Sequence, residues 1–410
     1  MSEYLNNYPV VLIHGLVGWG DQDGLNKTGV YPYWGWGPRS IDKHIRKKYG
    51  TEVFCPSLGP FNSAWDRACV FWAYLFGGTV DFGKVHSEKY GHARYGKTFE
   101  HGVLEDLGKT EAHKKMNIMG HSFGGPTVKE IQNLFIQGCK EEVEGTPEEE
   151  LSDLFKGGHG NLLHTVTTLS GVNNGTAFAS MFEDKGMTAI TYGTIAAATM
   201  LEKTPVMKMY NFGFQQWGLD TWPEDVKGWK LQSPLARKDV MRAYDKNKGF
   251  DAISHEMQIE VIQDEINPSQ TMSPDIYYFA QRAYKTHSNG HGGQRPDIFM
   301  NPVCLVPGIF TGTWSSGSRV QKFHLKGNPD WEKNDGYVNY IGTSAPLNQP
   351  HTAGDWQTDF KPGIWYNMEP VWGDHIFWNA MSGHKKDIFE FYDQCIETMR
   401  KLPDGETVNK

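Results

Sequence analysis

The sequence predicts an α/β protein built on a mostly parallel, doubly wound sheet with a large helical insertion. Short apolar runs that end in Gly or Pro alternate with segments of helical spacing, which is typical of strands joined by crossover helices. The 410 residues, 39% apolar and 21% charged, suffice for one large globular domain. One stretch, at about 175–250, lacks this alternation and is the expected insertion.

The elements follow in chain order. Residues 9–15 join β-branched side chains to a Gly turn, and residues 51–55 end at Pro56, so both are expected to be strands. Residues 116–119 form a short apolar strand, and 127–135 repeat apolar side chains at helical spacing. Further elements are strands at 162–169 and 276–279, a helix at 385–400, an apolar run at 303–306 that is core or a cleft wall, and a solvated acidic segment at 140–150.

Within the insertion, residues 190–201 are apolar on almost every side of a helix. Such a helix must be covered. Its cover is the protein core, a substrate cleft or a lipid surface.

Charge and composition exclude several classes of protein. The net charge is −8 and no long basic run exists, which argues against nucleic acid or an anionic membrane as the main partner. The five Cys are scattered without a CxxC pair, so the chain is not a disulfide scaffold. No apolar stretch is long enough to span a membrane, and no signal peptide is expected within this chain.

A nucleophile motif follows the strand at 116–119. Gly120-His121-Ser122-Phe123-Gly124 has the G-x-S-x-G pattern between an apolar strand and a helix. Small residues on either side of the serine let strand and helix pass closely while the hydroxyl stays exposed on a sharp turn. Ser122 is therefore the predicted nucleophile of an α/β-hydrolase fold.

Two backbone amides are expected to stabilise a developing oxyanion. One is the N–H of Phe123, directly after the nucleophile. The other is the N–H of Leu16, because His14-Gly15 follows the first strand and opens a glycine-rich loop. One such donor stabilises a transition state by roughly 3 kcal/mol.

The base and its carboxylate are selected by chain order, which on this fold runs Ser, Asp or Glu, then His. His375 lies in a loop before the last expected helix, with His384 as its rival and His351 as a weaker candidate. Asp335, in an Asp-Gly turn, is the expected orienting carboxylate. Asp374 is its rival, although side chains adjacent in sequence diverge.

These blocks together resemble the zinc-containing thermostable lipases of Gram-positive bacteria and, more distantly, the staphylococcal lipases. The resemblance implies that Ser122, Asp335 and His375 form a catalytic triad and that 175–250 is an extended helical lid. It also implies a secreted enzyme that hydrolyses triacylglycerols and simpler esters, with some relatives accepting synthetic polyesters. The resembling stretches are Val11-Leu12-Ile13-His14-Gly15-Leu16-Val17-Gly18-Trp19-Gly20, Trp65-Asp66-Arg67-Ala68-Cys69, Gly77-Gly78-Thr79-Val80-Asp81, His92-Ala93-Arg94-Tyr95-Gly96, Gln216-Trp217-Gly218-Leu219, Asn334-Asp335-Gly336 and Asp374-His375.

The same family holds a zinc ion with two Asp and two His. Asp66, His86 and His92 match three of these ligands. The fourth ligand follows a Ser-Pro pair, where Asp239 is the best match and Asp245 the fallback, since the local spacing departs by one residue. Four protein ligands close a tetrahedral shell, so the expected zinc is structural.

A calcium site is not expected. Relatives often bind calcium through a Glu two residues after the catalytic His, and Phe377 stands at that position here.

The sequence thus predicts a single domain over 1–410, with a zinc-binding extension at about 60–100 and the lid at about 175–250. The leading hypothesis is a lid-gated lipase or carboxylesterase acting on a lipid or ester substrate. One alternative is a hydrolase whose zinc, held by Asp66, His86 and His92, is itself catalytic. The other is a non-catalytic protein that binds a polymer through its aromatic surface.

Overall fold

The computed structural model describes residues 4–27, 29, 31–180, 210, 213, 215–217, 251–291, 293–313 and 329–405. At its centre lies a seven-stranded sheet of order β11-β12-β7-β6-β5-β1-β2, and every neighbouring pair in it is parallel. This confirms the predicted parallel sheet. Its strands are β1 (Val10–Ile13), β2 (Val53–Phe54), β5 (Met116–His121), β6 (Leu163–Leu169), β7 (Tyr277–Gln281), β11 (His351–Gly354) and β12 (Trp365–Met368).

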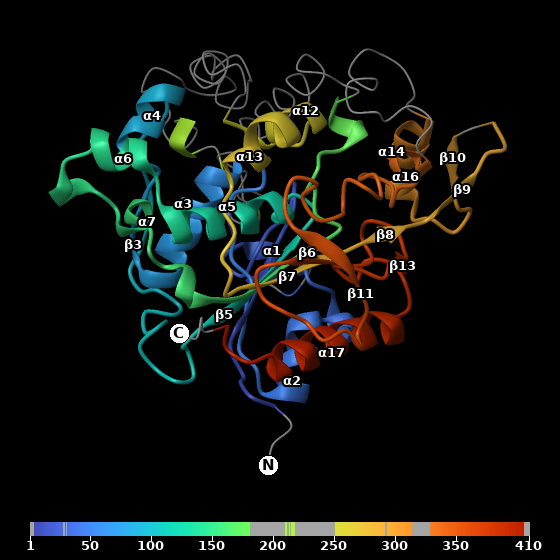
Figure 1. The fold of residues 1–410 in the computed structure, drawn as a ribbon, viewed down its shortest axis with the longest axis horizontal. Coiled ribbons are helices and arrows are strands. Elements are labelled where there is room, and N and C mark those ends of the chain that lie inside the picture. Colours follow the sequence, from blue (N-terminus) through green and yellow to red (C-terminus); the bar gives the residue numbers. More distant parts are fainter. Residues whose placement is uncertain are drawn as a thin grey trace, which may run out of the picture.

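The central strands are buried on both sides because helices cover both faces (Figure 1). All residues of β1, β5 and β6 are buried, which explains why β1 is a continuous apolar run rather than an alternating one. Helices α3 (Ala64–Phe76) and α5 (Gly124–Gln137) pack on one face, and α2 (Ile41–Tyr49) and α17 (Lys385–Lys401) pack on the other. The chain is therefore doubly wound, as predicted.

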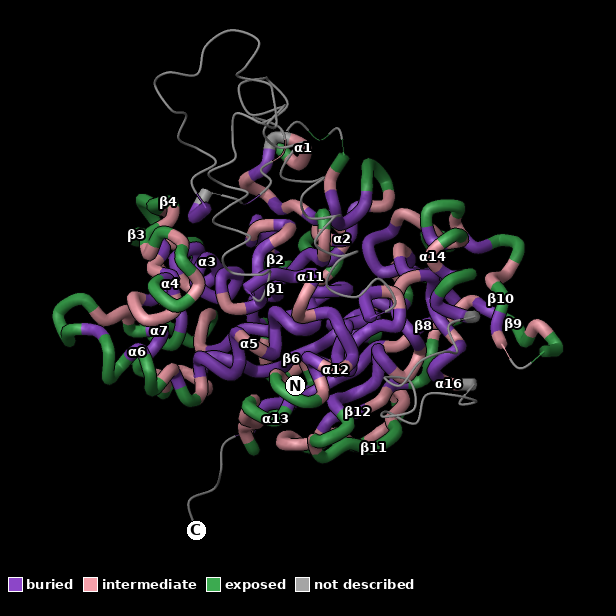
Figure 2. The backbone as a smooth tube through the Cα atoms, turned by 90° about the horizontal axis from the view of Figure 1, so that it is seen from above, coloured by how far each residue is buried: buried purple, intermediate pink, exposed green. Residues whose placement is uncertain are grey.

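Shorter elements surround this core. Figure 2 shows buried backbone through the centre of the molecule and exposed backbone at its outer loops. The short helices are α1 (Gly24–Lys27), η1 (Gly37–Arg39), α4 (Lys84–Tyr90), α6 (Lys140–Gly145), η2 (Glu148–Glu150), α7 (Asp153–Lys156), η3 (Gly160–Leu162), η4 (Gln215–Trp217), α11 (Ile253–Glu256), α12 (Ile259–Val261), η7 (Ile262–Ile266), α13 (Asn267–Ser269), α14 (Pro302–Thr313) and α16 (Pro329–Glu332). Two-stranded sheets pair β3 (Gly78–Asp81) with β4 (Tyr95–Phe99), β9 (Thr286–Ser288) with β10 (Gln294–Pro296), and β8 (Ala283–Tyr284) with β13 (Val371–Trp372).

Several local predictions can be compared with these elements. The apolar run 303–306 lies in α14, where Cys304 is buried while Val303 is 61% and Val306 56% exposed. The acidic segment forms α6 and η2 at the surface. Of the predicted lid, only 175–180, 210, 213 and 215–217 are described, so the expected apolar helix at 190–201 lies outside the described residues. Among the described residues, none forms a helix long and apolar enough to cross a membrane.

One histidine is built into the core far from the loops at the strand ends. His164 lies in β6, fully buried between the rings of Tyr8 and Tyr277, and its Nε2 is 3.3 Å from the carbonyl oxygen of Met399. Burial lowers the pKa of His164 to about 4 because the charged imidazolium is desolvated there.

The burial of His164 predicts a pH-dependent contribution to stability. Between pH 6.5 and about 4 the unfolded chain binds a proton that the folded His164 does not, so stability falls as the pH falls. His164→Gln loses the native hydrogen bond, but we expect its stability deficit to shrink by about 2 kcal/mol between pH 7.5 and pH 5. Urea unfolding at the two pH values measures this, with the exposed His351→Gln as control. A deficit that does not change with pH would contradict the prediction.

Candidate active site and metal centre

Ser122 stands on a sharp turn between β5 and α5. Its φ of 59° lies in the left-handed region, which is strained for a residue with a side chain. The turn is held because its backbone N–H donates to the carbonyl oxygen of Leu169 at 3.0 Å. A Cβ on Gly120 would collide with the carbonyl of Gly124, and one on Gly124 would lie 2.5 Å from the carbonyl oxygen of Ile13. The two glycines of the motif are therefore required for the approach of strand and helix.

The structure brings the predicted nucleophile, base and carboxylate together. His375 Nε2 lies 2.8 Å from Ser122 Oγ, and His375 Nδ1 lies 2.8 Å from Asp335 Oδ2. The other oxygen of Asp335 accepts the backbone N–H groups of Tyr337 and Val338, at 3.1 and 2.9 Å. Because the buried carboxylate can only accept, Nδ1 carries the proton, and Nε2 is free to accept from the serine hydroxyl.

The rival residues lie elsewhere. His384 is exposed at the start of α17, and His351 is exposed on β11. Asp374 is buried, but its carboxylate accepts from the Asn301 backbone N–H at 3.0 Å and from the Ser382 hydroxyl. None of the three contributes to the arrangement around Ser122.

The loop after β1 approaches the serine closely. A Cβ on Gly15 would lie 2.6 Å from Ser122 Cβ, so only glycine fits between them. The next residue is Leu16, and the loop is tied down where Val17 donates its N–H to Pro60. Neither the Leu16 nor the Phe123 N–H has a hydrogen-bond acceptor among the described residues. Both amides therefore remain available to a ligand beside Ser122.

A buried arginine supports this loop from behind. Arg67, on α3, is fully buried and donates from Nη2 to the carbonyl oxygen of His14. Burial lowers its pKa to about 9, and its guanidinium lies 5.5 Å from the ring centre of Phe123. Burial and the nearby Arg67 also hold the pKa of His14 well below its usual range. His14 therefore stays neutral, donating from Nδ1 to the Gly15 carbonyl oxygen at 2.9 Å and accepting the Leu58 N–H at Nε2.

A largely apolar cavity of about 500 Å³ opens at the serine. Its volume is within the range of sites that bind small molecules. Its walls combine Ser122 and His375 with side chains of the loop after β1 and of α14. The lining includes Leu16, Val17, Trp19, Ser122, Val172, Phe178, Val303, Tyr337, Val338 and His375.

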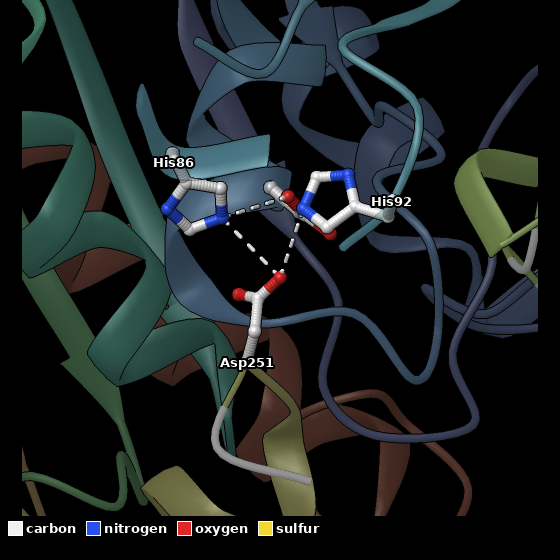
Figure 3. A group of neighbouring side chains, drawn as sticks. His86, His92 and Asp251 are labelled. Carbon is white, nitrogen blue, oxygen red and sulfur yellow. Dashed lines mark ion pairs between the residues drawn. The ribbon is translucent and has the colours of Figure 1, made fainter. Parts of the chain in front are cut away.

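A second polar group lies where α3, α4 and the chain after the insertion meet (Figure 3). His86 Nε2 and His92 Nε2 each lie 3.2 Å from Asp251 Oδ2, and His86 Nε2 lies 3.7 Å from Asp66 Oδ1. The four ligand atoms lie within 4.8 Å of one another. The edge of a tetrahedral zinc shell is about 3.3 Å, so this spacing suits four ligands around one cation.

Four polar atoms of this group are buried and face one another without a hydrogen-bond partner: Asp66 Oδ1, His86 Nε2, His92 Nε2 and Asp251 Oδ2. Buried polar atoms are normally satisfied, so four such atoms that face one another form a group suited to holding a cation. Their other atoms are oriented from outside, since His92 Nδ1 donates to the Ala93 carbonyl oxygen and Gln216 donates to the second oxygen of Asp66. Burial and the neighbouring Asp251 raise the pKa of Asp66 to about 7, a repulsion that a bound cation would relieve.

Three of the four residues in this group were predicted. The fourth is Asp251, which the sequence analysis did not single out. Asp239 and the fallback Asp245 lie outside the described residues. No motif around Asp251 distinguishes it in the sequence, since its partners come from a distant part of the chain.

The chain matches known proteins over nearly its whole length. A family model described as "Lipase-like, C-terminal domain" matches residues 6–400. A lipase of Staphylococcus epidermidis is 30% identical over 389 residues, which is 91% of this chain and 51% of that protein. Lipase 1 of Staphylococcus aureus is 31% identical over 373 residues, which is 89% and 49% respectively. The chain thus spans about half the length of the curated relatives it matches.

Solved structures of related proteins also superpose on nearly the whole chain. Staphylococcus hyicus lipase superposes with a TM-score of 0.80 at 26% identity, covering 98% of this chain and 97% of that one. EstA from Clostridium botulinum superposes with a TM-score of 0.79 at 28% identity, covering 98% and 89%. The predicted α/β-hydrolase fold and the predicted relation to lipases are confirmed.

Proposed function

Because this chain belongs to the family of lipase-like C-terminal domains, we propose that it hydrolyses carboxylic esters with Ser122 as the nucleophile. The observation that carries the proposal is the unbroken hydrogen-bond path from Ser122 Oγ through His375 to Asp335, at 2.8 Å for each step. The sharp turn at Ser122 and the unpaired backbone N–H groups of Leu16 and Phe123 support the same chemistry.

In the proposed reaction, Ser122 Oγ attacks the ester carbonyl carbon while its proton passes to His375 Nε2. Asp335 accepts from Nδ1 and stabilises the imidazolium that forms. The amides of Leu16 and Phe123 donate to the oxyanion, which then collapses as the C–O bond breaks and His375 protonates the leaving alcohol. Water, deprotonated by His375, attacks the acyl-enzyme, and the acid leaves with Ser122 restored.

The surroundings of the cavity favour lipid esters as substrates. Helix α14 carries no charged residue, and Val303, which lines the cavity, is 61% exposed. Val17, which also lines the cavity, is 49% exposed. Exposed apolar groups that cluster at a cavity suit contact with an ester aggregate. We include triacylglycerols, an extracellular location and, by resemblance, synthetic polyesters in the proposal.

We further propose that Asp66, His86, His92 and Asp251 hold a structural zinc ion. Two imidazoles and two carboxylates are donors that zinc accepts, and with four protein ligands no coordination position stays open for substrate. The ion would link α3 and α4 to the chain beyond the insertion. This is why we favour the serine mechanism over one with a catalytic metal.

The nucleophile is tested by Ser122→Ala. Removing the hydroxyl leaves no atom to form the acyl-enzyme, so kcat on a short p-nitrophenyl ester should fall by about 10⁶. Ser152→Ala, at the start of α7, is the matched control and should retain full activity. Near-normal activity in Ser122→Ala would favour the alternative in which a metal ion held by Asp66, His86 and His92 is catalytic. Binding of ester polymers without any turnover by the wild type would favour a binding protein instead.

Metal removal tests the zinc proposal. A chelator should lower the melting temperature, and zinc should restore it, while ester hydrolysis at 25 °C survives brief chelation because the ion touches no reacting atom. Asp251→Asn should bind less zinc in elemental analysis, whereas the exposed Asp359→Asn should bind as much as the wild type. Wild-type protein that never retains zinc, or an Asp251→Asn variant that retains it fully, would refute the assignment.

A further inference from the structure

A chain of hydrogen bonds joins the loop after β1 to the backbone of His375. The Gly15 N–H lies 3.1 Å from the hydroxyl oxygen of Tyr33. That hydroxyl lies 2.6 Å from His121 Nδ1, and His121 Nε2 lies 2.8 Å from the carbonyl oxygen of His375. The path therefore starts one residue before Leu16 and ends at the residue that carries the imidazole beside Ser122.

The donors and acceptors at the two ends of this hydrogen-bond path determine where its protons lie when His121 is neutral. The His375 carbonyl oxygen can only accept, so His121 Nε2 must carry a hydrogen. In a neutral imidazole Nδ1 is then an acceptor, and the Tyr33 hydroxyl must donate to it. The Tyr33 oxygen in turn accepts the Gly15 N–H, and the Asn379 amide also faces this oxygen. Only one arrangement of protons satisfies all three bonds.

Burial keeps that arrangement unchanged. Tyr33 is 5% and His121 2% exposed. Burial and the neighbouring His375 hold the pKa of His121 well below its usual range, and burial raises the pKa of Tyr33 to about 12. The His121 ring lies 4.8 Å from the His375 ring, centre to centre, so a neutral group sits beside the imidazole. A cation there would oppose imidazolium formation.

Packing holds the tyrosine in this position. Its ring makes edge contacts with those of Trp19 and Trp34, at 5.4 and 5.2 Å between centres. The hydroxyl therefore reaches Gly15 and His121 from a fixed ring, which makes it a rigid spacer between the loop after β1 and the end of β5.

We propose that Tyr33 and His121 are positioning residues for the hydrolytic reaction, which hold the Leu16 amide at a fixed distance from the His375 imidazole. This inference rests on the proposed function of Ser122. The oxyanion donor and the base must act on the same carbonyl group, and a displacement of about 1 Å in such a site can lower a rate on the order of 100-fold. Neither Tyr33 nor His121 is needed to touch the reacting atoms.

Tyr33→Phe tests the proposal with the smallest change. It removes the hydroxyl and leaves the Gly15 N–H and His121 Nδ1 unpaired while keeping the packed ring. We expect kcat on a short soluble p-nitrophenyl ester to fall at least about tenfold, with KM changed less than about twofold, since the effect is on the transition state. Tyr49→Phe is the matched control, because its hydroxyl bonds to Asp393 and Glu397 of α17 rather than to the Gly15–His121 path, so its loss should not change kcat.

His121 variants separate positioning from simple destabilisation. His121→Gln keeps an amide donor that can reach the His375 carbonyl oxygen, so it should retain more kcat than His121→Leu, which loses both bonds. In a double-mutant cycle, Tyr33→Phe should cost little once His121→Leu has broken the chain. All rates are measured well below the melting temperature of each variant, so that partial unfolding does not contribute.

The outcomes distinguish this inference from the proposed function. If Ser122→Ala is inactive but Tyr33→Phe keeps kcat within about twofold of the wild type, the serine mechanism stands and the positioning role is refuted. If the effects of Tyr33→Phe and His121→Leu on kcat were strictly additive, the proposal would also be refuted. Residues joined in one hydrogen-bond path should show coupled effects. If Ser122→Ala remains active, the proposed function itself fails.

Discussion

The structure depends on one strained residue, Ser122, held in the left-handed region between β5 and α5. The strain persists because the surroundings leave the turn no alternative: β5 is bonded on both sides within the sheet, and α5 is packed on its face. This turn requires the glycines on either side of the serine, because a Cβ there would collide with the backbone. It also requires Gly15, since a side chain at that position would collide with Ser122 in the closely packed loop after β1. The position of the hydroxyl is thus set by the sheet itself.

Around this turn the protein buries two histidines, His14 and His121, and keeps both neutral. His14 and His121 are both buried, yet they carry their proton on different nitrogens, because each faces a carbonyl oxygen from a different ring atom. In a region of low dielectric constant an unpaired polar atom is costly, so these bonds select one arrangement of the loops. Two charged groups are also buried here: the Arg67 guanidinium donates to the His14 carbonyl oxygen, and the Asp335 carboxylate accepts two backbone N–H groups.

The sequence could predict features that depend on neighbouring residues, but not those that depend on contacts between residues far apart in the chain. The strands, α5 and the serine motif are local patterns, and chain order then restricted the base and the carboxylate to His375 and Asp335, which the structure brings to Ser122. The fourth member of the metal group could not be located this way, because Asp251 meets Asp66 only through the folded chain and no local spacing marks it. The roles of Tyr33 and Arg67 were invisible for the same reason, since a hydrogen bond to a backbone atom leaves no side-chain pattern in the sequence.

The two polar centres meet on one turn of helix α3. Asp66 directs its carboxylate into the metal group, and the next residue, Arg67, donates to the carbonyl oxygen of His14 at the start of the loop that carries the Leu16 amide. The helix begins where the Ser63 hydroxyl accepts the Asp66 N–H, and Ala64 donates its N–H to Glu256, only five residues beyond Asp251. Because consecutive residues of a helix cannot move independently, the contacts of Asp66 with Gln216 and His86 also restrict the movement of Arg67. The group around Asp66 therefore helps to hold the loop after β1 in place beside Ser122.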